Sequence, residues 1–440
     1  MSRRGVRIGA AFASVALFAA ACGGDDGGSS NGGGPAEGSL EGQTIEVAAV
    51  WTGAEQESFR LVLDAFEERT GAEVQYTSTG DDIATVLNTR LQGGSPPDVA
   101  ILPQPGLLRD LAEQDALVPV NDAVSAAVDE NFAGIWRELG SVDGELYGVY
   151  WKAANKSLVW YNTEAFDDAG VEAPETWEDF TTVVSTLSDA GITPLSIAGG
   201  DGWTLTDWFE NVYLRVAGPE AYDQLASHEI PWTDQTVIDT LTILSELWSM
   251  PNAVSGGPEG ALQITFQQSV ADVFSDDPQA AIVFEGDFVA SVINAETSAT
   301  VGENAQFFTF PSINGSPTSV VAGGDVAVAL QDNEGAHGLL EFLASPEAAE
   351  IWAAQGGFLS PNQNVDLSVY PDESTQQIAQ ALIDAGDNVR YDMSDLQPAA
   401  FGATPSAGMW GILQDFLANP TDIQGTAQAL EEQATAAYGG

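Results

Sequence analysis

The stretch that decides the fold covers residues 44–102 and reads TIEVAAVWTGAEQESFRLVLDAFEERTGAEVQYTSTGDDIATVLNTRLQGGSPPDVAIL. Within it, apolar residues such as Phe59, Val62 and Phe66 recur at the spacing of an amphipathic helix, and a Pro-Pro pair precedes the last apolar run. The pattern predicts strand 44–50, helix 55–70, strand 74–76, helix 83–91 and strand 98–102. Strands that alternate with helices indicate a mostly parallel sheet.

The same alternation continues through the rest of the chain. It predicts helices over 176–190, 234–248, 262–270 and 338–343, and strands over 280–284 and 325–330. The first of these helices opens on a capping box, in which Thr176 and Asp179 satisfy free backbone N–H groups. We therefore expect an α/β protein made of two units, with the chain crossing between them more than once.

The composition excludes several classes of partner. The 440 residues include 12 Lys and Arg against 65 Asp and Glu, a formal net charge of −53 at pH 7. Such a chain repels nucleic acids and anionic bilayers, because phosphate binding needs clustered cations. With 44% hydrophobic and 9% aromatic residues, the chain nevertheless has the composition of a folded globular protein with a sizeable core.

The N-terminal residues predict export and a lipid anchor. Residues 1–21 combine Arg residues with a short apolar run, as a signal peptide does, and Cys22, the only cysteine, follows. The small residues before it resemble a bacterial lipobox, in which the thiol receives a diacylglycerol anchor; the alternative is an ordinary secretory signal with a chance cysteine. Residues 22–43 are rich in Gly and Ser and predict a flexible linker. We expect an extracytoplasmic protein, lipid-anchored to the outer face of the bacterial cell membrane.

Motifs of catalysis and cofactor binding are absent from the sequence. It holds two histidines, His228 and His337, and no His/Cys cluster, so zinc, haem and iron–sulfur sites lack ligands. Phosphate-binding loops, dinucleotide fingerprints and the G-x-S-x-G elbow of hydrolases do not occur. Carboxylates are too abundant for a pair of them to indicate a glycosidase, and the sequence leaves open whether a calcium ion is bound. We expect no cofactor and no enzymatic activity.

The two lysines of the chain form the most informative local feature. Lys152 and Lys156 lie close together in the sequence, next to Tyr150, Trp151 and Trp160. Flat rings beside hydrogen-bond donors are typical of sugar-binding sites, where the rings stack on pyranose faces. The alternative is that both lysines form structural ion pairs with some of the many carboxylates.

Three further segments combine aromatic, acidic and glycine residues. In the first, Trp203 and Asp207 stand near the start of a helix, where the alternatives to ligand contact are packing and capping. In the second, Asp287 and Phe288 follow an apolar strand, at the edge where open α/β sheets bind ligands, unless Asp287 only caps the next helix. In the third, Gly323-Gly324-Asp325 precedes a strand, and its glycines allow close backbone approach unless they form an ordinary turn.

Five segments, taken in order, resemble the extracellular solute-binding proteins of ABC sugar importers. They are Gly94-Ser95-Pro96-Pro97-Asp98-Val99, Val142-Asp143-Gly144-Glu145-Leu146-Tyr147-Gly148, Tyr161-Asn162, Pro174-Glu175-Thr176-Trp177 and Gly286-Asp287-Phe288. A further stretch, from Gly202-Trp203 to Asp207-Trp208 and on through Leu214-Arg215 and Gly218-Pro219, looks most like the alpha-glucoside-binding branch of that family. The resemblance runs from about residue 44 to the C-terminus.

The resemblance implies a periplasmic-binding-protein-like fold of type II, in which two discontinuous lobes joined by a hinge close over one neutral sugar. One lobe would comprise residues 44–153 and 314–375, and the other residues 154–313 and 376–440. Together with the lysine segment, the resemblance implies that the substrate-binding residues are Trp51, Glu55, Gln104, Lys152, Asn155, Trp203, Asp207, Asp287, Phe288, Gly324, Asp325 and Trp410. Phe288 stands where many relatives have Trp, and Leu102-Pro103 where maltose binders have an aromatic residue, which argues for a short sugar.

The expected partners are the sugar, the transmembrane subunits of an ABC permease and, through Cys22, the membrane. The protein is expected to be a monomer that releases its sugar unaltered after lobe closure. Two rival interpretations are a secreted glycoside hydrolase and a binding protein for another solute, such as a polyol.

Overall fold

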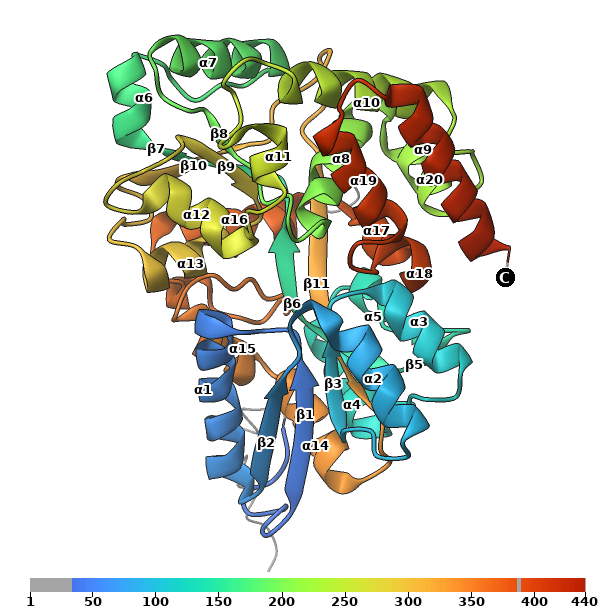
Figure 1. Cartoon of the computed structure of the whole chain (residues 1–440). Coiled ribbons are helices and arrows are strands. Elements are labelled where there is room, and N and C mark those ends of the chain that lie inside the picture. Colours follow the sequence, from blue (N-terminus) through green and yellow to red (C-terminus); the bar gives the residue numbers. More distant parts are fainter. Residues whose placement is uncertain (1–33, 386–388, 440) are drawn as a thin grey trace, which may run out of the picture. The chain divides into compact units, whose positions relative to one another are not determined.

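The computed structural model describes residues 34–385 and 389–439 (Figure 1). The predicted signal peptide and the anchor at Cys22 lie outside the described residues. Residues 34–43 differ from the predicted flexible linker, because Leu40 is buried in the core and its backbone N–H donates to the carbonyl of Thr70 at 3.0 Å. Leu40 is a large apolar side chain in a polar stretch, and its burial fixes this segment against the folded chain.

The larger sheet contains the strands of the opening stretch. Its order is β12 (Val389–Tyr391), β11 (Val320–Ala329), β3 (Val99–Leu102), β1 (Thr44–Ala49) and β2 (Glu73–Ser78), with β6 (Gly148–Asn155) paired to β11. β1 pairs in parallel with β2 and β3, which confirms the parallel arrangement expected from residues 44–102. β11 runs antiparallel to β3 and β6. The carboxyl ends of β1, β2 and β3 therefore meet at one edge of the sheet.

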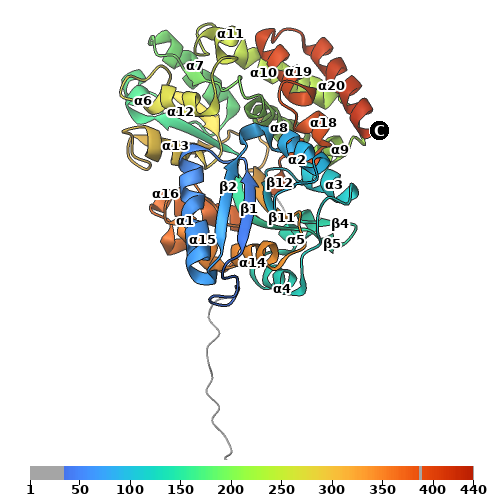
Figure 2. The same ribbon diagram turned by 60° about the horizontal axis from the view of Figure 1, so that its bottom comes forward.

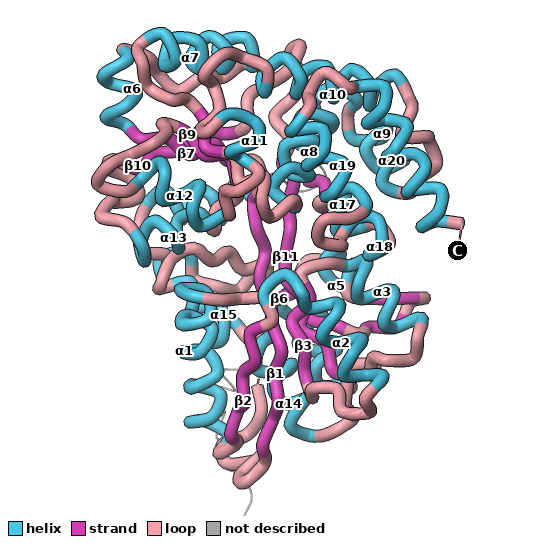
Figure 3. The backbone as a smooth tube through the Cα atoms, in the orientation of Figure 1, coloured by secondary structure: helices cyan, strands magenta, loops and turns pink. Residues whose placement is uncertain are grey.

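The smaller sheet has the order β10 (Ala305–Thr309), β7 (Leu158–Asn162), β9 (Ile282–Glu285) and β8 (Leu195–Ser196), and β4 (Ser141–Val142) pairs with β5 (Glu145–Leu146). The chain passes from the larger to the smaller sheet between β6 and β7 and returns between β10 and β11. The paired strands β6 and β11 lie side by side along this passage (Figure 3). This is the topology expected of two connected units, whereas the residue boundaries of the two lobes stay a prediction.

Helices pack on both sheets. In chain order they are α1 (Gly53–Thr70), η1 (Gly80–Asp82), α2 (Ile83–Gln92), α3 (Pro105–Glu113), α4 (Asp122–Asn131), α5 (Gly134–Leu139), α6 (Thr163–Ala169), α7 (Trp177–Asp189), α8 (Trp203–Ala217), α9 (Pro219–Ala226), α10 (Gln235–Trp248), α11 (Gly257–Ala261), α12 (Phe266–Phe274), α13 (Val289–Glu296), α14 (Glu334–Leu343), α15 (Pro346–Ala353), η2 (Leu367–Val369), α16 (Glu373–Ala385), α17 (Met393–Leu396), α18 (Ala399–Gly402), α19 (Gly408–Ala418) and α20 (Ile423–Tyr438). Figures 1 and 2 show α1 and α15 on one side of strands β1 and β2, with α2 and α3 on the other. None of the described helices has the length and apolar composition needed to cross a bilayer.

Three predicted elements differ from the structure in their bounds. The helix expected over 338–343 begins at Glu334, because Asn333 caps it by accepting from the backbone N–H of Ala336. The helix expected over 262–270 begins instead at Phe266, because Thr265 caps it by accepting from the backbone N–H of Gln268, and it extends to Phe274. The strand expected over 325–330 begins at Val320, so Gly323 and Gly324 lie inside β11 and not in a turn. A Cβ atom on Gly324 would lie 2.6 Å from the carbonyl oxygen of Lys152 on β6, so the close approach of these two strands requires glycine there.

Two main hydrophobic cores hold the segments that form the site. In one, Val47 of β1 packs with Phe59 of α1. In the other, Trp208 of α8 packs on Phe284 of β9, with ring centroids 4.6 Å apart. The start of α8 is therefore fixed relative to the smaller sheet, as the loops after β1 and β3 are fixed relative to the larger one.

Candidate functional site

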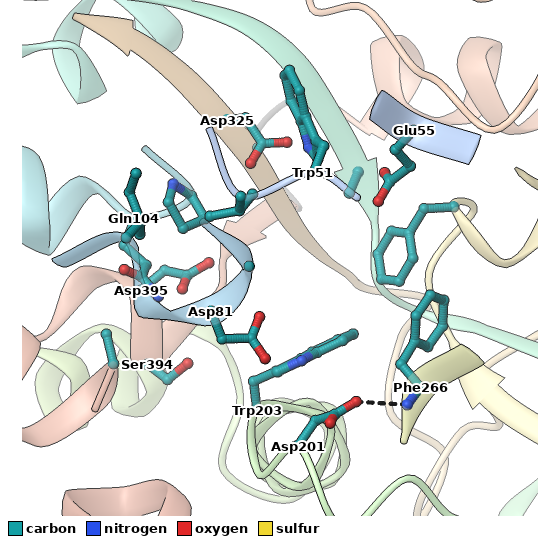
Figure 4. A pocket seen from close by; sticks show the side chains of 18 of the residues that line it. Trp51, Glu55, Asp81, Gln104, Asp201, Trp203, Phe266, Asp325, Ser394 and Asp395 are labelled. Atoms are coloured by element: carbon teal, nitrogen blue, oxygen red, sulfur yellow. Dashed lines mark hydrogen bonds between the residues drawn. The ribbon is translucent and has the colours of Figure 1, made fainter. Parts of the chain in front are cut away.

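A pocket of about 340 Å³ lies at the carboxyl edge of β1, β2 and β3 (Figure 4). Trp51 follows β1, Asp81 follows β2 and Gln104 follows β3, while Trp203 opens α8 and Phe266 opens α12. This edge is where open α/β sheets bind ligands. The loops after the strands of the larger sheet and the starts of α8 and α12 thus surround the same cavity.

Nine of the twelve predicted site residues line this pocket. They are Trp51, Glu55, Gln104, Lys152, Trp203, Phe288, Gly324, Asp325 and Trp410. They come from distant parts of the chain and meet at one cavity, as a binding site requires. Their contact with a ligand stays a prediction.

The other three predicted residues, Asn155, Asp207 and Asp287, are buried and lie outside the pocket lining. An oxygen of Asp287 accepts from the backbone N–H of Asn155 at 2.6 Å, and the amide oxygen of Asn155 accepts from the backbone N–H of Ser157 at 3.0 Å. Asp207 accepts from Lys156 at 3.3 Å. In this structure all three hold the passage between β6 and β7 in place instead of facing the cavity.

Aromatic side chains form one wall of the pocket. The ring of Trp203 lies 5.5 Å from that of Phe266 and 6.0 Å from that of Phe288, and the two Phe rings are 5.3 Å apart. Trp203 and Phe288 are only partly buried, so both leave surface open to the cavity. Flat, rigid rings of this kind match the C–H faces of a sugar. We call these three residues the aromatic wall.

Lys152 is a buried cation in the pocket lining, and it contacts both carboxylates and aromatic rings. Its Nζ lies 2.5 Å from Glu55 and 3.9 Å from Asp325, and it lies 5.4 Å from the centroid of the Trp51 ring and 4.9 Å from that of Trp352. Burial opposes the charge, but the two carboxylates outweigh it and raise the pKa of Lys152. Lys152 thus forms structural ion pairs and also lines the pocket, and its contact with a ligand stays a prediction. The neighbouring rings of Tyr150, Trp151 and Trp160 are instead buried in the cores and do not line the pocket, so the aromatic part of the lysine-segment prediction is wrong.

Lys156 is the centre of a second buried group of charges. Its Nζ lies 2.5 Å from Asp392, 3.3 Å from Asp207 and 3.8 Å from Asp395. Burial and then repulsion by neighbouring acids, only partly offset by Lys156, raise the pKa of Asp207 to about 8. For Asp392, the nearby ammonium outweighs burial and lowers the pKa to about 2. We call these four residues, with Glu210 and Glu285, the hinge charge cluster.

The acids of the hinge charge cluster other than Asp392 have raised pKa values. Both oxygens of Glu285 are buried without a hydrogen-bond partner among the described residues, and burial raises its pKa well above the usual range. Oxygens of Asp207, Glu210 and Asp392 lie within 4.8 Å of one another, as metal ligands do. Those of Glu210, however, already accept from Tyr222 and from the backbone N–H groups at 393 and 394, and Asp392 accepts from Lys156. Glu210 and Asp392 are thus supplied with donors by the protein, whereas one oxygen of Asp207 is buried without a hydrogen-bond partner among the described residues.

Several pocket residues were missed by the sequence analysis. They include Asp81, Asp201, Phe266, Ser394 and Asp395. Asp81 had a usable signal, since it follows a predicted strand at the edge where ligands bind. Asp395 had none, because it stands on the short helix α17, and only the tertiary fold brings that helix to the cavity.

Comparison with known proteins identifies the family. Residues 51–350 match the bacterial extracellular solute-binding proteins. The chain is 34% identical over 395 residues to the osmoprotective compounds-binding protein GgtB of Synechocystis sp., covering 88% of this chain and 91% of that protein. It is also 34% identical over 395 residues to the alpha-glucosides-binding periplasmic protein AglE of Rhizobium meliloti, covering 86% and 84%.

Solved structures show the same fold. The bacterial solute receptor AcbH, described as having an exclusive preference for β-D-galactopyranose, aligns with a TM-score of 0.79 at 23% identity, over 90% of this chain and 99% of that one. The solute-binding protein RafE in complex with raffinose aligns with a TM-score of 0.73 at 16% identity, over 90% and 99%. These likenesses confirm the predicted two-lobed fold of type II.

The family match covers more than half of the chain, and the chain therefore belongs to the bacterial extracellular solute-binding proteins. It is therefore an extracellular solute-binding protein and not an enzyme.

Proposed function

We propose that the protein captures a neutral mono- or oligosaccharide, an alpha-glucoside in the first instance, and delivers it to its permease. The observation that carries the proposal is the aromatic wall, which faces a pocket rich in carboxylates and amides. Rings stack on the apolar faces of a sugar while oxygens of Glu55, Asp325 and Gln104 bond to its hydroxyls. The name of the relative AglE supports an alpha-glucoside.

The pocket volume favours a short ligand. At about 340 Å³ it is near the lower end of the range for ligand pockets, roughly 300–1,000 Å³. The residues at 102 and 103 are Leu and Pro, so they offer no ring for a second stacked sugar beside the loop after β3. We infer that one or two sugar units are bound.

Capture works by lobe closure, with the lobes drawn at residues 44–153 with 314–375 and 154–313 with 376–440. A ligand that touches both lobes stabilises the closed state only by the contacts that it makes there and not in the open state. The closed form then docks to the transmembrane subunits of the permease. No bond in the sugar is broken.

We also propose that the protein is a monomer that is held at the membrane through a lipid on Cys22. The support is the sequence of residues 1–22. Mass spectrometry of the protein isolated from membranes tests this, because a diacylglycerol-modified N-terminal Cys22 is expected, whereas an unmodified cysteine or cleavage elsewhere would contradict it.

A ligand panel tests the proposed function. We expect maltose, trehalose, sucrose or another neutral glycoside to change the Trp fluorescence saturably, with a Kd in the micromolar range, and to be recovered unaltered. A response only to charged solutes would contradict the proposal. Turnover of an aryl glucoside would instead favour the rival hydrolase.

A second candidate ligand is a polyol or a polyol glycoside. It is favoured by the name of the relative GgtB, an osmoprotective compounds-binding protein as similar to this chain as AglE is. Including glycerol glycosides and free polyols in the same panel separates the two candidates. The class whose best member has a Kd at least tenfold lower than that of the other class is the ligand class.

A further inference from the structure

Two carboxylates outside the predicted site share one part of the pocket. Asp81 lies in η1, directly after β2 of the larger sheet, and Asp201 lies just before α8, which packs in the second core. Both line the pocket, and Figure 4 shows them gathered with Trp203. The two acids therefore approach the same space from the two sides of the proposed cleft.

The positive charges of the pocket are already engaged elsewhere. Five acidic residues line it against two lysines. Lys152 is held by Glu55 and Asp325, and Lys156 by the hinge charge cluster. Neither Asp81 nor Asp201 forms an ion pair with any cation in the described part of the chain.

The hydrogen-bonding capacity of the two acids is also largely unused. One oxygen of Asp201 accepts from the backbone N–H of Phe266 at 2.6 Å. The other oxygen of Asp201 and both oxygens of Asp81 accept no hydrogen bond from a described residue. Partial desolvation in the pocket, followed by the charges of Asp201 and Asp82, raises the pKa of Asp81 to about 6. Asp81 is therefore mostly ionised at pH 7, without a counter-charge among the described residues.

An independent side chain indicates that this pocket is built for a ligand. Gln104 is only 7% exposed and lines the pocket, yet its amide bonds to no described residue. Because buried polar groups are normally paired, the side-chain amide of Gln104 points to a polar occupant.

We propose that Asp81 and Asp201 determine specificity by forming a cation-selecting subsite, which takes a protonated amine carried by a glycoside or a polyol. The inference rests on the proposed function, since it adds a feature to the ligand of the same pocket. An ammonium group donates charge-assisted hydrogen bonds to the free oxygens of both acids and so links the two sides of the cleft. A carboxylate on the ligand is repelled by the same two acids.

The test begins with the neutral panel on the full chain, which supplies a parent sugar or polyol. Derivatives of this parent, or of every panel member if none of them binds, then carry an amine or a carboxylate in place of one hydroxyl, at each position in turn, and are titrated at pH 7 by Trp fluorescence. At one position we expect the amine to bind at least tenfold more tightly than the parent and the carboxylate at least tenfold more weakly. Amines that bind no more tightly than the parent at any position would overturn the proposal.

The variants Asp81→Asn and Asp82→Asn form a matched pair, because both residues are exposed neighbours in η1 but only Asp81 lines the pocket. Asp81→Asn should reduce the advantage of the amine, which is the ratio of the Kd of the parent to the Kd of the amine, to less than threefold, whatever its effect on the parent itself. Asp82→Asn should keep the advantage, and equal effects of the two variants would contradict a specific role for Asp81.

The outcomes separate this inference from the proposed function. If a neutral parent binds and none of its amine derivatives binds more tightly, the proposed subsite is overturned and the proposed function stands. An amine ligand that depends on Asp81, in the absence of any neutral ligand, supports the subsite and overturns the neutral-sugar proposal. A protein that binds no member of either series overturns both.

Discussion

Trp203 is the side chain on which ligand binding depends most directly. It is partly open to the pocket and belongs to the aromatic wall. Trp203→Ala should weaken binding of the sugar more than tenfold, because a stacked ring loses its contact area, while the melting temperature changes little. Trp177→Ala is the control, since Trp177 is also partly buried and packs on Phe180 and Phe310 outside the pocket. A loss of stability without a loss of affinity in Trp203→Ala would assign Trp203 to the core.

Lys156 is expected to matter for folding before it matters for binding. It is the single cation of the hinge charge cluster, so Lys156→Met should lower the free energy of unfolding by about 3 kcal/mol. The double variant Lys156→Met with Asp392→Asn should recover part of this loss, because one uncompensated buried charge is removed with its partner. Urea unfolding of the ligand-free protein measures both, and a double variant less stable than the single one would contradict the account.

Among the elements, the pair β6 and β11 controls the connection between the two sheets. Gly324 lies where these strands approach most closely, so Gly324→Ala should cost about 2 kcal/mol of stability by pushing them apart. Gly134→Ala is the control, because a Cβ atom there meets nothing within 4 Å. Thermal unfolding should show a drop for the first variant and a change below about 0.5 kcal/mol for the second. Equal stability of the two variants would rule out the proposed strand contact.

The elements of the larger sheet could be predicted because their patterns are local. In residues 44–102 the spacing of apolar residues and the Gly and Pro breaks are enough to place three strands and two helices. Gly323 and Gly324 could not be placed in a strand, because the reason for glycine there is the nearness of β6, which the sequence does not reveal. The start of α12 was misplaced because apolar residues continue across the turn before Thr265.

The site was predictable where a residue's position determined its role. Trp51 and Gln104 follow strands of the parallel sheet, and this alone places them at the ligand-binding edge. The roles of individual acids could not be read in the same way, because 65 carboxylates look alike in sequence. Asp207, which was predicted to bind the ligand, is hydrogen-bonded to Lys156, whereas Asp81, which was not predicted, lines the pocket.

For the whole molecule, the buried acids predict a stability that falls as the pH rises. Burial raises the pKa of Asp325 to about 6, of Asp287 to about 7 and of Asp207 to about 8, from ordinary values near 4. The folded state therefore holds protons that the unfolded state has lost, so these groups stabilise fully below about pH 4 and lose this contribution as the pH rises through 6 to 8. The low pKa of Asp392 acts in reverse and costs stability as the pH falls from about 4 to 2.

We accordingly expect the melting temperature to be highest near pH 4 and several degrees lower at pH 8.5. The net charge of −53 adds repulsion in the same direction, but salt screens surface charges and not buried ones. The difference should therefore persist in 0.5 M salt and shrink in Asp207→Asn. A melting temperature that is independent of pH between 5 and 8.5 would contradict the proposed protonation of the buried acids.

Hydrogen exchange with and without the bound sugar tests the central claim, that two sets of segments close on one ligand. The account predicts simultaneous slowing of backbone exchange after β1, β2 and β3 and at the starts of α8 and α12, with little change in α4 or α20. Slowing confined to one of the two sets, or to segments outside the pocket, would contradict capture between two lobes.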